Sequence, residues 1–200
     1  MLIMGHRGAA GYEPENTFSS FKKALKLKVD IIELDVHVCK TGELVVIHDS
    51  DVDRTTDGSG NVKELSLDEL QTLDAGKGEK IPTLNEILEL VSGKVKVNIE
   101  LKGKGTAEPV NRVIEEFIIK GWSYDDFIIS SFDYNELNEF YMFNKKIKIW
   151  VLVDKSSKDF FEFAEEINAY SINPSLNTVD EPFVECAHKK GLKVFVWTVN

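Results

Sequence analysis

Short apolar runs alternate with amphipathic stretches along nearly the whole chain, and this alternation restricts the fold more than any other feature. The apolar runs are rich in Val, Ile and aromatic residues, which favour β-strands. They cover residues 2–5, 30–38, 44–49, 96–102, 127–132, 148–153, 169–173 and 193–199. The amphipathic stretches are typical of helices and cover 17–28, 83–92, 108–120, 133–143, 156–167 and 181–190. Strands that alternate with helices predict a parallel sheet, either open or closed into a barrel.

One connection breaks this pattern. Only residues 40–43 lie between HVC (37–39), which ends the second apolar run, and the third run, and a parallel crossover needs a dozen residues or more. The two runs therefore predict an antiparallel hairpin. If its turn is centred between Thr41 and Gly42, Asp35 lies opposite His48.

The number of strands bears on the choice between an open sheet and a barrel. With the return arm of the hairpin counted as an extension, seven parallel strands remain, whereas a (β/α)₈ barrel has eight. We expect either an open sheet or a barrel that lacks its last unit. The length of 200 residues suits one domain over residues 1–200. Residues 50–82 fit neither element type and are expected to form a rim insertion with a short helix over 66–74.

Two strands carry polar residues on one face only. Glu33 and Asp35 lie two residues apart, so both side chains point to the same side of their strand. The same alternation recurs in a second strand at Asn98, Glu100 and Lys102. A polar face on one strand alone commonly faces water. Here the helices must cover the apolar face, so the polar residues face the other side of the sheet, which in a barrel is its interior.

Three carboxylates gathered inside a barrel would repel one another unless their charge is neutralised. A bound divalent cation provides this neutralisation. Ligation by carboxylate oxygens alone suits Mg²⁺ or Ca²⁺ rather than zinc. The sequence therefore predicts a metal site made by Glu33, Asp35 and Glu100.

Histidines and cations are predicted beside this site. His6 and His48 end apolar runs, at the strand ends where parallel α/β active sites form. Imidazoles suit general acid and base catalysis, while Arg7 and Lys102 supply positive charge that matches a phosphate. A metal, two histidines and two cations together indicate hydrolysis of a phosphate ester. Of the other histidines, we expect His37 to line the upper barrel and His188 to lie at a helix end.

Composition excludes several other classes. The net charge of −10 disfavours binding to nucleic acid or to anionic membranes. Two cysteines without paired spacing predict neither a disulfide framework nor a zinc site. No signal peptide and no apolar run long enough for a membrane span is visible. We therefore expect a cytoplasmic protein with a small-molecule substrate and no stable membrane association.

An ordered set of short motifs from residue 4 to residue 200 resembles the glycerophosphodiester phosphodiesterase family. The motifs are HRG, PENT, ELDV, VVIHD, RTTDGSG, IPTL, ELK, SSF and VWTVN. The resemblance implies a TIM barrel with a small insertion after the second strand. It also implies hydrolysis of glycerophosphodiesters to sn-glycerol 3-phosphate and an alcohol.

The resemblance further implies a role for each candidate residue. Glu33, Asp35 and Glu100 would hold a divalent metal, and His6 and His48 would act as general acid and base. Arg7 and Lys102 would contact the phosphate, Glu15 and Asn16 would support the site or the glycerol end, and Trp197 would line the pocket.

Members of the family usually continue past WTVN through a helix and an eighth strand, so we expect this chain to be a shortened form of a longer protein. Two rival functions remain open at this stage. One is a lipid-directed lysophospholipase D or a phospholipase C-like enzyme, and the other is a non-catalytic barrel that binds phosphate or metal. The headgroup preference, the choice between Mg²⁺ and Ca²⁺, and the oligomeric state are not fixed by the sequence.

Overall fold

The computed structural model describes residues 2–155 and 158–198 of the 200-residue chain. Its strands are β1 (Met4–Gly5), β2 (Ile31–Val38), β3 (Leu44–Val46), β4 (Lys96–Leu101), β5 (Phe127–Ser131), β6 (Lys148–Val153), β7 (Ser171–Pro174) and β8 (Lys193–Val194). Its α-helices are α1 (Phe18–Leu27), α2 (Leu67–Leu70), α3 (Leu84–Val91), α4 (Ala107–Ile119), α5 (Tyr134–Phe143), α6 (Phe160–Glu166) and α7 (Glu181–Lys189). Two short 3₁₀ helices, η1 (Val62–Glu64) and η2 (Tyr124–Asp126), complete the set for the described residues.

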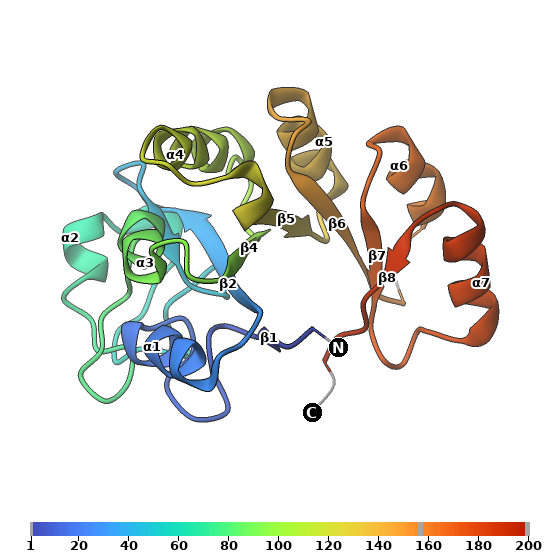
Figure 1. The fold of residues 1–200 in the computed structure, drawn as a ribbon. Helices are drawn as coiled ribbons and strands as arrows, with labels where there is room; N and C mark the ends of the chain where they lie inside the picture. The colour runs from blue at the N-terminus through green and yellow to red at the C-terminus, as the bar shows by residue number, and fades with distance from the viewer. Residues whose placement is uncertain (1, 156–157, 199–200) are drawn as a thin grey trace.

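The strands form one curved parallel sheet in the order β1-β2-β4-β5-β6-β7-β8, and β3 alone pairs antiparallel, with β2. The helices lie on the outside of this curve, and β1 and β8 are its two ends (Figure 1). No pairing joins β1 to β8 within the described part of the chain. The predicted barrel-type α/β fold is therefore confirmed as a sheet curled into a partial barrel.

The alternation of polar and apolar residues decides which face of the sheet points where. On β2 and β4, Ile32, Leu34 and Ile99 belong to the main core between the sheet and its helices. Their neighbours Glu33, Asp35 and Glu100 are buried on the opposite, inner face. A smaller cluster of Ile31, Ile128 and Trp150 closes the inside of the barrel below these residues. The polar groups thus lie above an apolar floor.

The predicted hairpin is confirmed, but its predicted register is wrong by one residue. Val36 pairs with Val46, and the amide of Ile47 donates to the carbonyl of Asp35 at 3.0 Å. The reason is the turn: the Cys39 amide donates to the Glu43 carbonyl at 2.9 Å, and this pairing of residues 39 and 43 centres the turn on Thr41. His48 therefore does not lie opposite Asp35. His48 comes directly after Ile47, whose amide makes the hydrogen bond to Asp35 at the end of the hairpin ladder.

Several element boundaries are shorter than predicted. The helix expected over 66–74 is one turn, α2, and the strand expected over 193–199 is β8 followed by a single bridge between Trp197 and Ser175. Residues 156–157 of the predicted helix 156–167 and Val199 lie outside the described residues. Capping boxes begin three of the helices in the described part of the chain, at Ser66, Thr83 and Ser123.

The rim region 50–82 packs on a small core of its own. Val52, Val62, Leu70 and Ile81 form this rim core with Val45, Ile47 and other residues near the hairpin. Cys39 and Cys186 are both free, as expected. Across the described residues, no helix is long and apolar enough to cross a membrane.

Candidate active site

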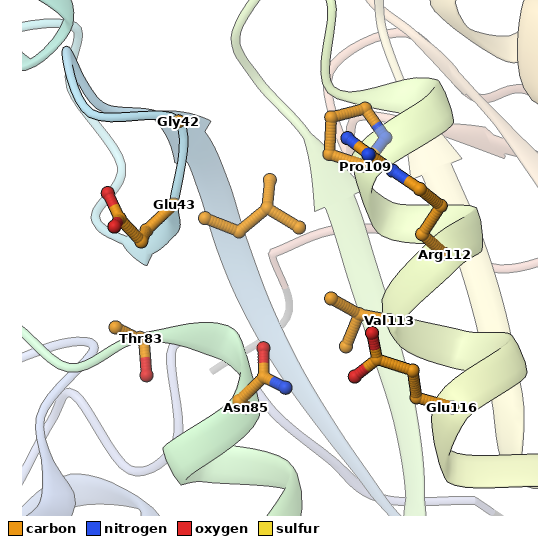
Figure 2. Close-up of a pocket in the computed structure, with 9 residues that line it drawn as sticks. Gly42, Glu43, Thr83, Asn85, Pro109, Arg112, Val113 and Glu116 are labelled. Atoms are coloured by element: carbon orange, nitrogen blue, oxygen red, sulfur yellow. The ribbon is translucent and has the colours of Figure 1, made fainter.

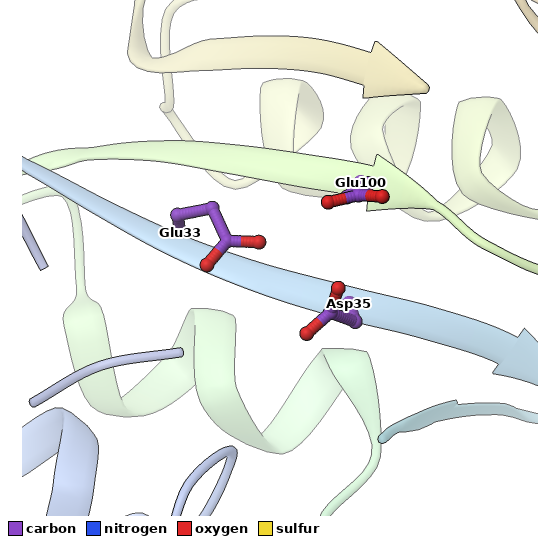
Figure 3. Close-up of side chains that lie close together, drawn as sticks. All are labelled: Glu33, Asp35 and Glu100. Atoms are coloured by element: carbon purple, nitrogen blue, oxygen red, sulfur yellow. The ribbon is translucent and has the colours of Figure 1, made fainter. Parts of the chain in front are cut away.

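Three carboxylates meet on the inner face of the sheet, where β2 and β4 lie side by side. Asp35 is the direct neighbour of Glu100 in the parallel ladder, and Glu33 precedes Asp35 by two residues on β2. Each residue offers one oxygen, and these oxygens lie within 4.8 Å of one another. Figure 3 shows the three side chains pointing toward a common point. The predicted acidic cluster therefore exists.

Burial makes this cluster electrostatically unfavourable by itself. Burial, together with the negative charges of Asp35 and Glu100, raises the pKa of Glu33 well above its ordinary value. Burial and the charge of Asp35 also raise the pKa of Glu100, to about 7, although Lys102 opposes the shift. A nearby positive charge would reverse both effects.

The residues fit a divalent cation. Within the described part of the chain, the buried oxygens Glu33 Oε1 and Asp35 Oδ1 accept no hydrogen bond. Buried carboxylate oxygens normally have partners, because an unsatisfied charged group is costly. Oxygen donors of this kind are those that Mg²⁺ and Ca²⁺ prefer.

The HRG motif folds tightly against this cluster. The Arg7 amide donates to Glu33 Oε2 at 2.6 Å, and Arg7 itself has a left-handed backbone with φ of 50°. Gly8 follows with φ of 81°, and a Cβ at this position would lie 2.5 Å from Ser20 Oγ. Glycine is therefore required here. The turn brings the Arg7 guanidinium toward the carboxylates, with its Nε 3.6 Å from Asp35 Oδ2.

The PENT motif supports the same corner. Asn16 is buried and donates from Nδ2 to Asp35 Oδ2 at 2.9 Å. Glu15 accepts a 2.8 Å hydrogen bond from Arg7 Nη1. Both residues thus contact members of the predicted site through their side chains.

The two candidate histidines line one cavity with Glu33 and Glu100. His6 Nε2 lies 4.0 Å from Glu33 Oε2, and burial together with Arg7 lowers the pKa of His6. His48 is only partly buried, and its Nδ1 forms a 2.5 Å hydrogen bond with Asp49 Oδ1. His37 lies on the inner face as expected, where its Nε2 donates to the backbone carbonyl of His48 at 3.1 Å. His188 lies in the last turn of α7, as the sequence predicted.

The cavity has a volume of about 300 Å³ and opens at the carboxyl ends of the strands. Its lining includes His6, Arg7, Glu33, His48, Glu100, Lys102, Phe132 and Trp197. Lys102 Nζ lies 3.0 Å from Glu100 Oε1, and the rings of Phe132 and Trp197 meet edge to face at 5.4 Å. The structure therefore brings together the predicted histidines, cations, carboxylates and tryptophan in or beside one space.

Two residues near the site were not singled out from the sequence. Arg54, in the rim region, binds Asp49 through Nε at 2.6 Å and Glu15 through Nη2 at 2.8 Å. Its hydrogen bond, and that of His48, hold the pKa of Asp49 well below its usual range although burial acts in the opposite direction. Asp49 ends the VVIHD motif and Arg54 begins the RTTDGSG motif, so both residues lie in motifs that resemble the family. The sequence alone did not indicate that the two side chains contact each other.

A second hollow, of about 340 Å³, lies outside the sheet between the hairpin turn, the start of α3 and α4 (Figure 2). Its charged lining residues are Glu43, Arg112 and Glu116. It contains no histidine and none of the clustered carboxylates. We therefore assign the chemistry to the inner cavity.

The fold and the inner cavity define a class of protein: a parallel α/β barrel with an acidic centre and basic neighbours where its strands end, as suits phosphate-ester chemistry. Residues 6–200 match the model of the glycerophosphoryl diester phosphodiesterase family. The chain belongs to this family.

Individual relatives agree with this assignment. A glycerophosphodiester phosphodiesterase of Caldanaerobacter subterraneus subsp. tengcongensis is 41% identical over 211 residues, which cover 100% of this chain and 86% of that protein. A phosphodiesterase of Oleispira antarctica, solved in complex with the product sn-glycerol-3-phosphate, superposes with a TM-score of 0.90 at 30% identity and covers 100% of this chain and 85% of that one. A glycerophosphodiester phosphodiesterase of Thermotoga maritima superposes with a TM-score of 0.82 at 33% sequence identity, and the match covers 100% of this chain and 87% of that one.

Proposed function

We propose that this chain hydrolyses glycerophosphodiesters to sn-glycerol 3-phosphate and an alcohol. The observation that carries the proposal is the shared cavity, where a buried acidic cluster lies beside His6, His48, Arg7 and Lys102. The family and the product bound to the Oleispira antarctica relative support this substrate class. We propose that residues 1–200 act as one catalytic domain.

The acidic cluster would hold one divalent cation, Mg²⁺ or Ca²⁺, through Glu33, Asp35 and Glu100. Such an ion supplies Lewis acidity and neutralises negative charge on the phosphate and on the three carboxylates. The unpartnered oxygens Glu33 Oε1 and Asp35 Oδ1 support this assignment.

Arg7 and Lys102 would bind the phosphodiester oxygens. Both are near the carboxylates, Arg7 Nε at 3.6 Å from Asp35 and Lys102 Nζ at 3.0 Å from Glu100. A phosphate bound at the acidic cluster would therefore lie within reach of two fixed cations. Positive groups placed in advance stabilise the charge that develops in the transition state without later rearrangement.

His6 and His48 would act as general acid and base. One would take a proton from the nucleophile, and the other would give a proton to the leaving alkoxide. The nucleophile is either water or the glycerol 2-hydroxyl of the substrate; in the second case a cyclic phosphate forms, and water then opens it to give sn-glycerol 3-phosphate. Asn16 would orient Asp35, and Glu15 would orient Arg7. Trp197, whose Nε1 is fixed by a 2.8 Å bond to the Asn173 carbonyl, would form the pocket wall.

Product release tests this function. We expect the protein to liberate glycerol 3-phosphate from glycerophosphocholine or glycerophosphoethanolamine with Mg²⁺ or Ca²⁺, and to lose this activity in EDTA. Turnover of lysophosphatidylcholine alone would favour a lysophospholipase D instead. If none of the substrates is cleaved under any of these conditions, the enzymatic proposal is wrong and a binding module is the better reading. The cytoplasmic location stays a prediction from the sequence.

A further inference from the structure

Arg54 joins two residues that each hold a different member of the proposed catalytic machinery. Its Nε donates to Asp49 Oδ2 at 2.6 Å and its Nη2 to Asp49 Oδ1 at 3.2 Å. Its Nη1 and Nη2 donate to the two oxygens of Glu15 at 3.0 and 2.8 Å. Four of the five N–H groups of the guanidinium are thus engaged by these two carboxylates.

The first branch of this network ends at His48. Asp49 Oδ1 lies 2.5 Å from His48 Nδ1. An ionised carboxylate can only accept, so Nδ1 carries the hydrogen of this bond, and in the neutral ring Nε2 is then the free, proton-accepting nitrogen. Arg54 holds Asp49 from its other side. The ring orientation of His48 therefore depends on a side chain fixed from the rim.

The second branch ends at Arg7. Glu15 Oε1 accepts from Arg7 Nη1 at 2.8 Å and from Arg54 Nη2 at 2.8 Å, so one oxygen is shared by two guanidinium groups. Arg54 therefore binds, from the rim region, the same carboxylate that binds Arg7 next to the acidic cluster, and Glu15 links the two guanidinium groups.

From this arrangement we propose that Arg54 is a positioning residue, which orients His48 through Asp49 and Arg7 through Glu15. The inference rests on the proposed function, because it assigns Arg54 a part in the same reaction. It also gives the rim region a role in catalysis: residues 39 positions apart in the chain, Glu15 and Arg54, set the geometry of one site.

The exposure of Arg54 separates this role from a purely structural one. Its side chain is 48% exposed, and ion pairs at such positions contribute little to folding stability because water and salt screen them. Misplacement of a catalytic group by a small distance, in contrast, lowers rates strongly. Loss of Arg54 should therefore affect turnover far more than unfolding.

The test compares Arg54→Met with Arg112→Met. Arg112 lies on α4 in the outer hollow, with a 66% exposed side chain and one long ion pair, at 4.0 Å, to Glu108. We expect Arg54→Met to lower kcat/KM for glycerophosphocholine by about ten- to a hundredfold, with an unfolding midpoint within about 3 °C of the parent protein. Arg112→Met should match the parent in both. Arg54→Lys should recover only part of the activity, because one ammonium cannot bridge two carboxylates in fork geometry.

The two branches can be separated by kinetics. We expect Asp49→Asn to lower kcat, through His48, and Glu15→Gln to raise KM, through Arg7. In the Asp49→Asn, Glu15→Gln double variant, adding Arg54→Met should lower kcat/KM by less than about threefold, because Arg54 then has no carboxylate left to act through. An equal loss in both backgrounds, or parent-like activity of Arg54→Met, would overturn the proposal.

A measurement that does not depend on turnover can test the role of Arg54 separately from the proposed function. The ¹⁵N chemical shifts of the His48 ring should report a hydrogen on Nδ1 in the parent protein and a changed tautomer population in Arg54→Met. Unchanged ring shifts would contradict the His48 branch even if the parent hydrolyses its substrates. If the parent cleaves no glycerophosphodiester, the proposed function fails, while the ring shifts still decide whether Arg54 orients His48.

Discussion

Asp35 and Glu100 are direct neighbours in the ladder between β2 and β4, and both are buried on the inner face of the barrel. Two acidic side chains placed opposite each other on adjacent strands repel one another. With Glu33 added, the barrel buries three carboxylates at one place. A cation bound between these carboxylates, as proposed, would remove this repulsion.

Removing a metal ligand should abolish the metal response. We expect Mg²⁺ or Ca²⁺ to raise the unfolding midpoint of EDTA-treated protein, since a ligand present at about a hundred times its Kd stabilises the native state by about 2.7 kcal/mol. Glu33→Gln should remove most of this shift and most of the activity. Glu116→Gln, in the outer hollow, is the matched control and should retain both. Differential scanning fluorimetry measures the unfolding midpoint with and without the metal. An equal metal-induced shift of the midpoint in the two variants would refute the assignment.

Loss of either histidine proposed as general acid or base should lower turnover without unfolding the protein. We expect His6→Ala and His48→Ala to reduce kcat by about 10²- to 10⁴-fold, the usual contribution of general acid–base catalysis. His188→Ala, at the exposed end of α7, should have the kcat of the parent. The measurement is steady-state release of glycerol 3-phosphate. Parent-like kcat in both site variants would rule out the acid–base assignment.

Lys102 should act mainly on phosphate binding and charge stabilisation. Its ammonium lies 3.0 Å from Glu100 and on the wall of the cavity. We expect Lys102→Met to lower kcat/KM by about ten- to a hundredfold, since one charge-assisted hydrogen bond to an oxyanion is worth about 1.5–3 kcal/mol. Lys104→Met, two residues on and exposed, serves as the control. The idea fails if the two methionine variants have the same kcat/KM.

Glu136 should matter for stability rather than for catalysis. It is buried on α5 and accepts from the amides of Gly105, Thr106 and Ala107, the last of which begins α4. Helix α4 has no capping side chain of its own, so Glu136 takes this part from another helix. We expect Glu136→Ala to cost about 2–4 kcal/mol of unfolding free energy, because several donors lose a charged acceptor.

Glu139→Ala is the matched control for this cap. It lies on the same helix with an exposed side chain, so its effect should stay within about 0.5 kcal/mol. Urea unfolding of the two variants measures the difference. If Glu136→Ala and Glu139→Ala unfold at the same urea concentration, the cap contributes nothing to stability.

Most of the fold was predictable because its signals are local. Alternating residues in 30–38 and 96–102 placed Glu33, Asp35 and Glu100 on one face, and a four-residue connection required the hairpin. The predicted hairpin register was wrong by one residue because Cys39 pairs with Glu43 and so centres the turn on Thr41, a detail of backbone hydrogen bonding that residue type alone does not determine.

The remaining features depend on contacts between distant segments. Arg54 meets Glu15 across 39 positions, and Glu136 reaches Thr106 across 30. Neither residue belongs to a periodic pattern, so nothing local indicates its partner. The inner cavity could be located from the sequence, whereas the side chains that fix its members in place required the folded chain.

The separate core of the rim region has a consequence for how this protein family can diversify. Because Val52, Val62 and Leu70 pack with one another and with the hairpin rather than in the main core, substitutions there need not propagate into the barrel. Substitutions of these apolar residues can therefore accumulate while the strands that carry the acidic cluster stay unchanged. Arg54 belongs to the same rim region but is tied to Glu15 and Asp49, so it is not free to vary in this way.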